Sequence, residues 1–159
     1  MKKILFLILL CPFLFAQRTT SVGISMIKHY EGFRGKTYLC PASVMTIGYG
    51  HLISKPMVIT EYQAEQLLIK DLPRYEKYVS NSSGRILKWN EFDALVSFTF
   101  NVGCRFDNNF RDNISLGRTS LVIVQMSKYI HGGGIVLKGL INRRKSETNL
   151  YKNAILTFY

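Results

Sequence analysis

The chain has 159 residues, a length that favours a single domain large enough to bury its own hydrophobic core. Its 21 Lys and Arg against 10 Asp and Glu give a formal charge of +11, which favours an anionic partner such as nucleic acid, an acidic membrane surface or an acidic cell envelope. The three cysteines, Cys11, Cys40 and Cys104, have spacings that fit no zinc or redox motif.

The first predicted element is an export segment. Two lysines precede an apolar run from residue 4 to residue 16, the pattern of a secretory signal peptide. The run is shorter than the roughly 20 apolar residues that span a bilayer, and Pro12 would kink it. We therefore expect residues 1–16 to be a signal peptide and residues 17–159 to be one domain, exported through the inner membrane to the periplasm or the extracellular space. The alternative is an uncleaved or transient membrane anchor.

A short helix and a few strands are predicted to open the domain. Ser21 is a candidate N-cap for a helix over residues 21–30, and Gly32 supplies its end. Residues 37–39 and 45–52 are rich in β-branched and aromatic side chains, which predicts two short strands. The alternative for both segments is an irregular loop.

The rest of the chain is predicted to be helical. Thr60 and Gln63 form a capping box ahead of an amphipathic helix, which Pro73 would bend or end. A second helix, capped by Asn90 and ended by Gly103, is apolar almost all round, which indicates the buried centre of a helical lobe. Two further helices are predicted for residues 120–130 and 138–150, with a glycine turn at 132–134. A small sheet followed by helices, without strand–helix alternation, predicts an α+β fold.

Three chemically reactive side chains lie close together in the sequence: Glu31, Cys40 and Thr46. Glu31 falls at a helix C-terminus, where the helix dipole and partial burial both disfavour a charged carboxylate, and this suits a general acid. Cys40 is held on a stiff backbone by the proline that follows it, and Thr46 is predicted to share a bare strand face with Gly48 and Gly50. The alternatives are a solvated glutamate at its own helix end and a small buried cysteine.

The opposite face of the same strand is predicted to be structural. It carries Ile47, Tyr49 and His51, which we expect to face the packed interior. For His51 the expected partner is Asp71, near the end of the long amphipathic helix.

The spacing of the three reactive residues resembles the signature of glycoside hydrolase family 24, the phage-type lysozymes or endolysins. In that signature a Glu is followed after eight residues by Asp or Cys, and after five more by Thr, as in Glu31, Cys40 and Thr46. Further segments are similar to the family in the same order: residues 63–68, 92–98, 100–104, 139–140, 143–144 and 147.

The resemblance implies a lysozyme-like fold, with a small antiparallel sheet lobe, a larger helical lobe and an active-site cleft between them. It also implies hydrolysis of the β-1,4 bond between N-acetylmuramic acid and N-acetylglucosamine in peptidoglycan. In this reaction Glu31 would protonate the departing sugar oxygen, while Cys40 and Thr46 would position or activate water. The inverting or retaining outcome stays open, because it depends on a distance between the reacting groups that a sequence does not give.

The same resemblance implies supporting residues. Arg143 is a candidate to reach Glu31 and hold it, and Leu52 and Phe100 would line the sugar cleft. The alternatives are a solvated helix charge for Arg143 and core packing for the other two. We expect peptidoglycan and the anionic cell envelope as partners, no nucleic acid, no cofactor and no metal ion, and a monomeric chain.

Cys40 departs from the commoner Asp of the family. A thiol is mostly protonated at neutral pH, so Cys40 would act either through its shape or as a thiolate favoured by cations such as Arg34 or Lys36. Oxidation would disable it, so we expect a thiol in preference to a bridge with Cys104 or Cys11. Two rival functions remain: a catalytically impaired peptidoglycan-binding protein, and a cationic membrane-disrupting protein.

Overall fold

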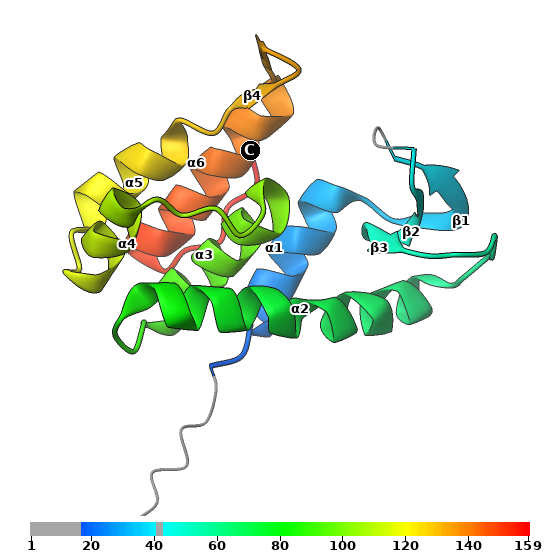
Figure 1. Ribbon diagram of the computed structural model, residues 1–159, viewed down its shortest axis with the longest axis horizontal. Coiled ribbons are helices and arrows are strands. Elements are labelled where there is room, and N and C mark those ends of the chain that lie inside the picture. The colour runs from blue at the N-terminus through cyan, green and yellow to red at the C-terminus, as the bar shows by residue number, and fades with distance from the viewer. Residues whose placement is uncertain (1–16, 41–42) are drawn as a thin grey trace, which may run out of the picture.

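The computed structural model describes residues 17–40 and 43–159, so the predicted signal segment lies outside the described residues. A helical body and a small sheet lobe are joined by one long helix, α2 (Figure 1). The helices are α1 (Ser21–Glu31), α2 (Glu61–Ser83), α3 (Trp89–Val102), α4 (Asn108–Ser115), α5 (Thr119–Ser127) and α6 (Lys138–Asn153). The strands are β1 (Arg34–Leu39), β2 (Met45–Gly48), β3 (His51–Leu52), β4 (His131–Gly132) and β5 (Ile135–Val136). The predicted α+β class is confirmed.

The helical body is built around α3. This helix packs against α1, α2 and α6, and most of its side chains are buried on every side. The fully or almost fully buried apolar residues of α3 are Phe92, Ala94, Leu95, Val96 and Phe98. The prediction of a buried central helix is therefore confirmed, and its physical basis is the apolar sequence around its whole circumference.

Asn90 does not cap α3, as the sequence had suggested. The helix begins at Trp89 with Lys88 in the N-cap position. The Asn90 side chain is buried and donates hydrogen bonds to the backbone carbonyls of Leu150 (3.1 Å) and Tyr151 (2.8 Å). The Asn90 side chain therefore connects α3 to the last turns of α6 and does not cap its own helix.

Asp93 fixes the start of α1 from a neighbouring helix. Its buried carboxylate accepts hydrogen bonds from the backbone N–H groups of Thr20 (2.9 Å) and Gly23 (3.0 Å), and from the Thr20 hydroxyl. Thr20, and not Ser21, is the N-cap of α1. An acidic group at a helix N-terminus satisfies otherwise unpaired N–H groups and interacts favourably with the helix dipole.

The long helix α2 links the two lobes in one piece. Its predicted capping box is confirmed, with Thr60 and Gln63 exchanging side-chain and backbone hydrogen bonds. Pro73 lies inside the helix and does not end it. Pro73 is exposed, and its neighbours Leu72 and Tyr75 are buried in the core, so packing on both sides holds the helix together.

The sheet lobe is a three-stranded antiparallel sheet in the order β1-β2-β3. The single strand predicted for residues 45–52 is wrong, because a turn at Tyr49 and Gly50 divides it into β2 and β3. The predicted glycine floor beside the threonine is also wrong. Gly48 has a φ of +64°, which breaks the alternation, and a Cβ there would lie 2.9 Å from the Cβ of Ala64 on α2.

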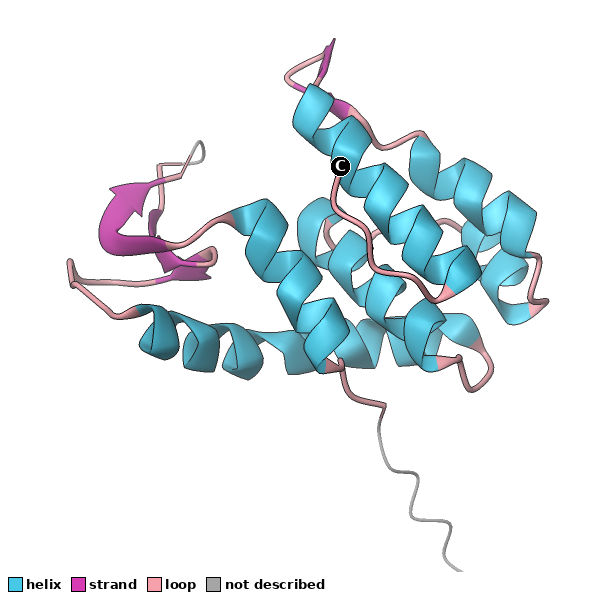
Figure 2. Cartoon of the chain, turned by 180° about the vertical axis from the view of Figure 1, so that it is seen from behind, coloured by secondary structure: helices cyan, strands magenta, loops and turns pink. Residues whose placement is uncertain are grey.

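Two short elements were not predicted. They are α4 and the β4–β5 hairpin, whose turn at Gly133 and Gly134 corresponds to the predicted glycine turn. Seen from behind, the hairpin projects from the helical body, and the sheet lobe stands at the far end of α2 (Figure 2). No helix in the described part of the chain is both long and apolar enough to cross a membrane.

Candidate active site

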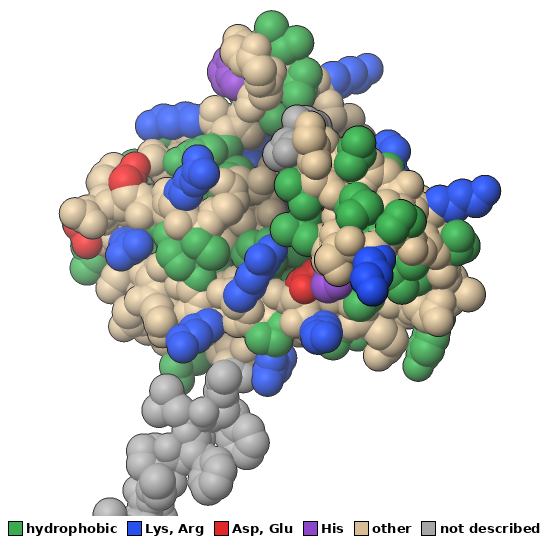
Figure 3. Space-filling model, turned by 45° about the vertical axis from the view of Figure 1, so that its right-hand side comes forward, with side chains coloured by type: hydrophobic (Ala, Val, Ile, Leu, Met, Phe, Trp, Pro, Cys, Tyr) green, Lys and Arg blue, Asp and Glu red, His purple; other side chains and the backbone are tan. Residues whose placement is uncertain are grey.

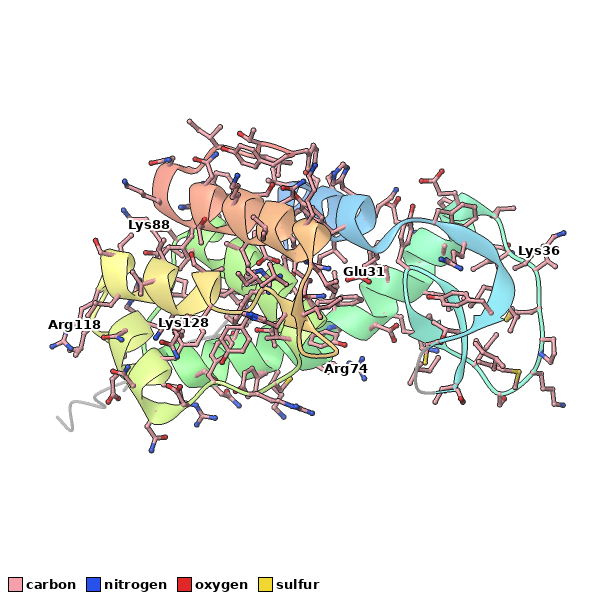
Figure 4. The ribbon with its side chains drawn as sticks, turned by 90° about the horizontal axis from the view of Figure 1, so that it is seen from above. Glu31, Lys36, Arg74, Lys88, Arg118 and Lys128 are labelled. Carbon is pink, nitrogen blue, oxygen red and sulfur yellow. The ribbon has the colours of Figure 1, made fainter. Side chains whose placement is uncertain are left out.

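Glu31 lies where the helical body meets the sheet lobe. It is the last residue of α1, and Gly32, with a φ of +70°, turns the chain into β1. Figure 4 shows Glu31 between the helices and the sheet, and Figure 3 shows the surface hollowed between the same two parts. The side chain is about one quarter exposed, at 23%. The predicted position of Glu31 at a helix C-terminus is confirmed.

Arg143 reaches Glu31 from α6. Its Nη1 lies 2.6 Å from Oε1 of Glu31, so the predicted contact is confirmed. The other guanidinium nitrogens donate to the carbonyl of Ser97 (Nη2, 3.1 Å) and to Oε1 of Glu147 (Nε, 3.1 Å). With three separate acceptors around one planar group, the guanidinium is fixed in orientation, and it fixes Glu31 in turn.

Glu147 is the charged centre of this network. Its side chain is fully buried, and it accepts hydrogen bonds from Arg143, Arg144 (Nη2, 3.1 Å) and the hydroxyl of Ser97 (2.8 Å). Burial alone would lower the pKa of Arg143, but the nearby carboxylates of Glu147 and Glu31 outweigh it and raise that pKa. The sequence had placed Glu147 in a family-like segment without assigning it a role.

The ion pair also decides which oxygen of Glu31 is able to carry a proton. A guanidinium has donors only and does not take up a proton, so Oε1 stays an acceptor while Arg143 is bound. A proton on Glu31 therefore belongs on Oε2. This geometry holds Oε1 in place, and proton transfer by Glu31 would use Oε2.

A row of three paired residues crosses the sheet. Tyr38 on β1 lies directly opposite Thr46 on β2, and Thr46 lies directly opposite Leu52 on β3. Thr46 is buried, and its hydroxyl donates to the backbone carbonyl of Val44 (3.0 Å), so its lone pairs are left to accept a hydrogen bond. Leu52 is exposed, which suits a residue that contacts a ligand.

Cys40 follows β1 directly and is half-buried. Its N–H donates to the carbonyl of Val44 (3.0 Å), which continues the β1–β2 pairing by one step. The two cysteines that the structure describes, Cys40 and Cys104, form no bridge with each other, while Cys11 lies outside the described residues. Figure 4 shows Lys36 at the outer edge of the sheet lobe, away from Glu31, and its influence on the Cys40 thiol stays a prediction.

The remaining predicted residues are the pair of His51 and Asp71 and the two apolar residues Phe100 and Leu52. Nδ1 of His51 lies 2.8 Å from Oδ2 of Asp71, so the predicted pair is confirmed and fastens β3 to α2. Phe100, near the end of α3, is half-buried, with its ring centroid 4.8 Å from that of Tyr75. Phe100 packs against the core of the helical body, whereas Leu52 is exposed on the sheet lobe, so the two residues come from different lobes.

Comparison with known proteins identifies the family. The model of the phage lysozyme family matches residues 28–147. An endolysin of Bacillus phage PZA is 35% identical over 141 residues, covering 84% of this chain and 55% of that protein. An endolysin of Acyrthosiphon pisum secondary endosymbiont phage 1 is 32% identical over 140 residues, covering 83% of this chain and 96% of that protein. The chain belongs to the phage lysozyme family.

The fold agrees with this membership. The muramidase domain of SpmX from Asticcacaulis excentricus superposes with a TM-score of 0.80 at 31% identity, covering 86% of this chain and 99% of that domain. The lysozyme-like architecture predicted from the sequence is therefore confirmed. The chain spans only about half the length of the Bacillus phage endolysin. The stretch that matches the phage lysozyme family contains every residue predicted for the site, while their individual roles stay predictions.

The buried network predicts that replacing Glu147 costs much more stability than replacing a surface glutamate. Glu147→Gln leaves Arg143 and Arg144 buried without their shared carboxylate, and we expect the free energy of unfolding in urea to fall by about 3–5 kcal/mol. The matched control is Glu65→Gln, which removes a surface ion pair with Lys28 and should cost less than about 1 kcal/mol. Equal, small losses in the two variants would show that Glu147 does not hold the network together.

Proposed function

We propose that the chain is a muramidase, which hydrolyses the β-1,4 bond between N-acetylmuramic acid and N-acetylglucosamine in peptidoglycan. Membership of the phage lysozyme family supports this function, as do relatives named endolysin and muramidase. The observation that carries the proposal is the placement of Glu31. A carboxyl group lies at the junction of the lobes, with one oxygen held by Arg143 and the other available for proton transfer.

In the proposed reaction Glu31 is the general acid. Protonated on Oε2, it gives its proton to the glycosidic oxygen as the bond between that oxygen and the sugar carbon breaks. The carboxylate that results is stabilised by the guanidinium of Arg143, which already bonds Oε1. Because Arg143 is fixed by Glu147 and Ser97, no reorientation is needed when the charge appears.

Water completes the reaction from the sheet lobe. Its oxygen forms a bond to the sugar carbon, and its surplus proton passes to Cys40 when that residue is a thiolate, or to solvent when Cys40 acts only by shape. Thr46 donates its own proton to Val44, so it holds the water by accepting a hydrogen bond from it. Leu52 and Phe100 contact the sugars from opposite walls of the cleft.

We further propose that the protein acts at an anionic cell envelope as a monomer, after export directed by residues 1–16. The formal charge of +11 supports attraction to such a surface. Basic side chains are spread over the face drawn in Figure 3 rather than gathered in one place, which suits a diffuse anionic surface.

The decisive variant is Glu31→Gln, which keeps the size of the side chain but removes the acid. We expect kcat for reducing-end release from purified peptidoglycan to fall by about 10²–10⁴-fold, with binding to the wall retained. Glu65→Gln, on the exposed side of α2, is the control that should keep full activity.

Other outcomes of the same assay separate the rival functions. Wild-type protein that binds peptidoglycan but releases no reducing ends would be a wall-binding protein. Lysis that survives Glu31→Gln would indicate membrane disruption. Mass analysis of the fragments identifies the bond that is broken, and a 1,6-anhydro product would indicate a lytic transglycosylase instead of a hydrolase.

A second prediction concerns the thiol. Cys40→Asp should keep or raise kcat, because a carboxylate is ionised at neutral pH and accepts a hydrogen bond from water more strongly than a neutral thiol does. Cys40→Ala should lose most of the activity, since it removes both the sulfur and its shape. Reducing-end release measured for both variants tests this, and full activity in Cys40→Ala would show that the thiol takes no part.

A further inference from the structure

The register of the sheet brings a fourth side chain to the catalytic residues. Tyr38 lies directly opposite Thr46, which lies directly opposite Leu52, and residues directly opposite in antiparallel strands project to the same face. Cys40 is two residues after Tyr38 and still pairs with Val44 through its N–H, so it continues that face. Tyr38 is therefore a neighbour, on one face of the sheet, of two residues proposed to handle water.

The ring of Tyr38 is packed on one side by an arginine. Its ring is half-buried, and the guanidinium carbon of Arg34 lies 4.5 Å from the ring centroid. The strand register shifts between Arg34 and Tyr38, an irregularity of the kind that re-aims side chains near active sites. The guanidinium over the ring is a cation–π contact, which favours this orientation of the phenol.

The phenol of Tyr38 senses the charges of the acid and the thiol. Burial raises the pKa of the phenol most, the Arg34 guanidinium lowers it, and the nearby Glu31 and Cys40 side chains raise it further. The net shift is upward, so the phenol keeps its proton at neutral pH and remains a hydrogen-bond donor.

A donor is what the water site still needs. A water molecule has two protons and two lone pairs, and one lone pair must attack the sugar carbon. Thr46 accepts one proton, because its own proton is given to Val44. In the proposed reaction Cys40 accepts the other proton, and a hydroxyl that donates to the second lone pair would leave a single lone pair for attack.

We propose that Tyr38 is a further catalytic residue, whose hydroxyl donates a hydrogen bond to the attacking water that Thr46 and Cys40 hold from other sides. The proposal rests on the proposed muramidase function. Tyr38 keeps its proton throughout, so no bond to the phenol forms or breaks. Sulfur is a weaker acceptor than a carboxylate, and the phenol offsets the looser hold that Cys40 has on the water.

Tyr38→Phe tests this, because it removes only the hydroxyl and keeps the ring beneath Arg34. We expect kcat for reducing-end release to fall by about 10–100-fold, with KM and the melting temperature almost unchanged. Tyr62→Phe, an exposed tyrosine on α2, is the matched control and should behave as wild type. Wild-type kcat in Tyr38→Phe would overturn the proposal.

A double-mutant cycle with Cys40→Asp gives a readout that a structural role would not move. A carboxylate at position 40 holds the water firmly, so Tyr38→Phe should cost less than about threefold in that background. The same fold-loss in both backgrounds would overturn the proposal, because it would mean that Tyr38 and position 40 do not share one water. Wild-type protein that releases no reducing ends removes both proposals, whereas an active wild type with a fully active Tyr38→Phe removes only this one.

Discussion

The buried carboxylate of Glu147 is the constraint on which the site depends. It is enclosed between α3 and α6, where an unpaired charge would be strongly unfavourable. Arg143 and Arg144 neutralise it. The Nη1 group of Arg143 then remains to bind Glu31. The acid at the surface of the cleft is thus oriented by a charge network whose geometry is set in the protein core.

Helix α1 is held at both ends by residues of other helices. Asp93 on α3 binds its first turn, and Arg143 on α6 binds Glu31 in its last. The sheet lobe is fastened separately, through α2 and the pair of His51 and Asp71. This arrangement fixes the acid relative to the helical body, whereas the water-handling residues come from the sheet lobe. The proposed reaction therefore depends on how the two lobes are placed relative to each other.

Sequence patterns predicted the long elements well and the tertiary contacts unevenly. The capping box of α2 and the apolar α3 are local signals, and both were found. Asn90 was misread because its side chain binds α6 instead of its own helix, and the strand face at Gly48 because a positive φ reverses the alternation. The place of Tyr38 depends on strand register, which no local pattern specifies, whereas the pair of Arg143 and Glu31 came from family resemblance.

The core network orients Glu31 for proton transfer, and Arg143→Lys tests this role most directly. Lysine keeps the positive charge beside Glu147 but lacks the planar fork that bonds Glu31, Glu147 and Ser97 together. We predict a folded protein whose kcat for reducing-end release is lower by about tenfold or more, since a small misplacement of a catalytic group is costly. A folded variant with wild-type kcat would contradict the claim.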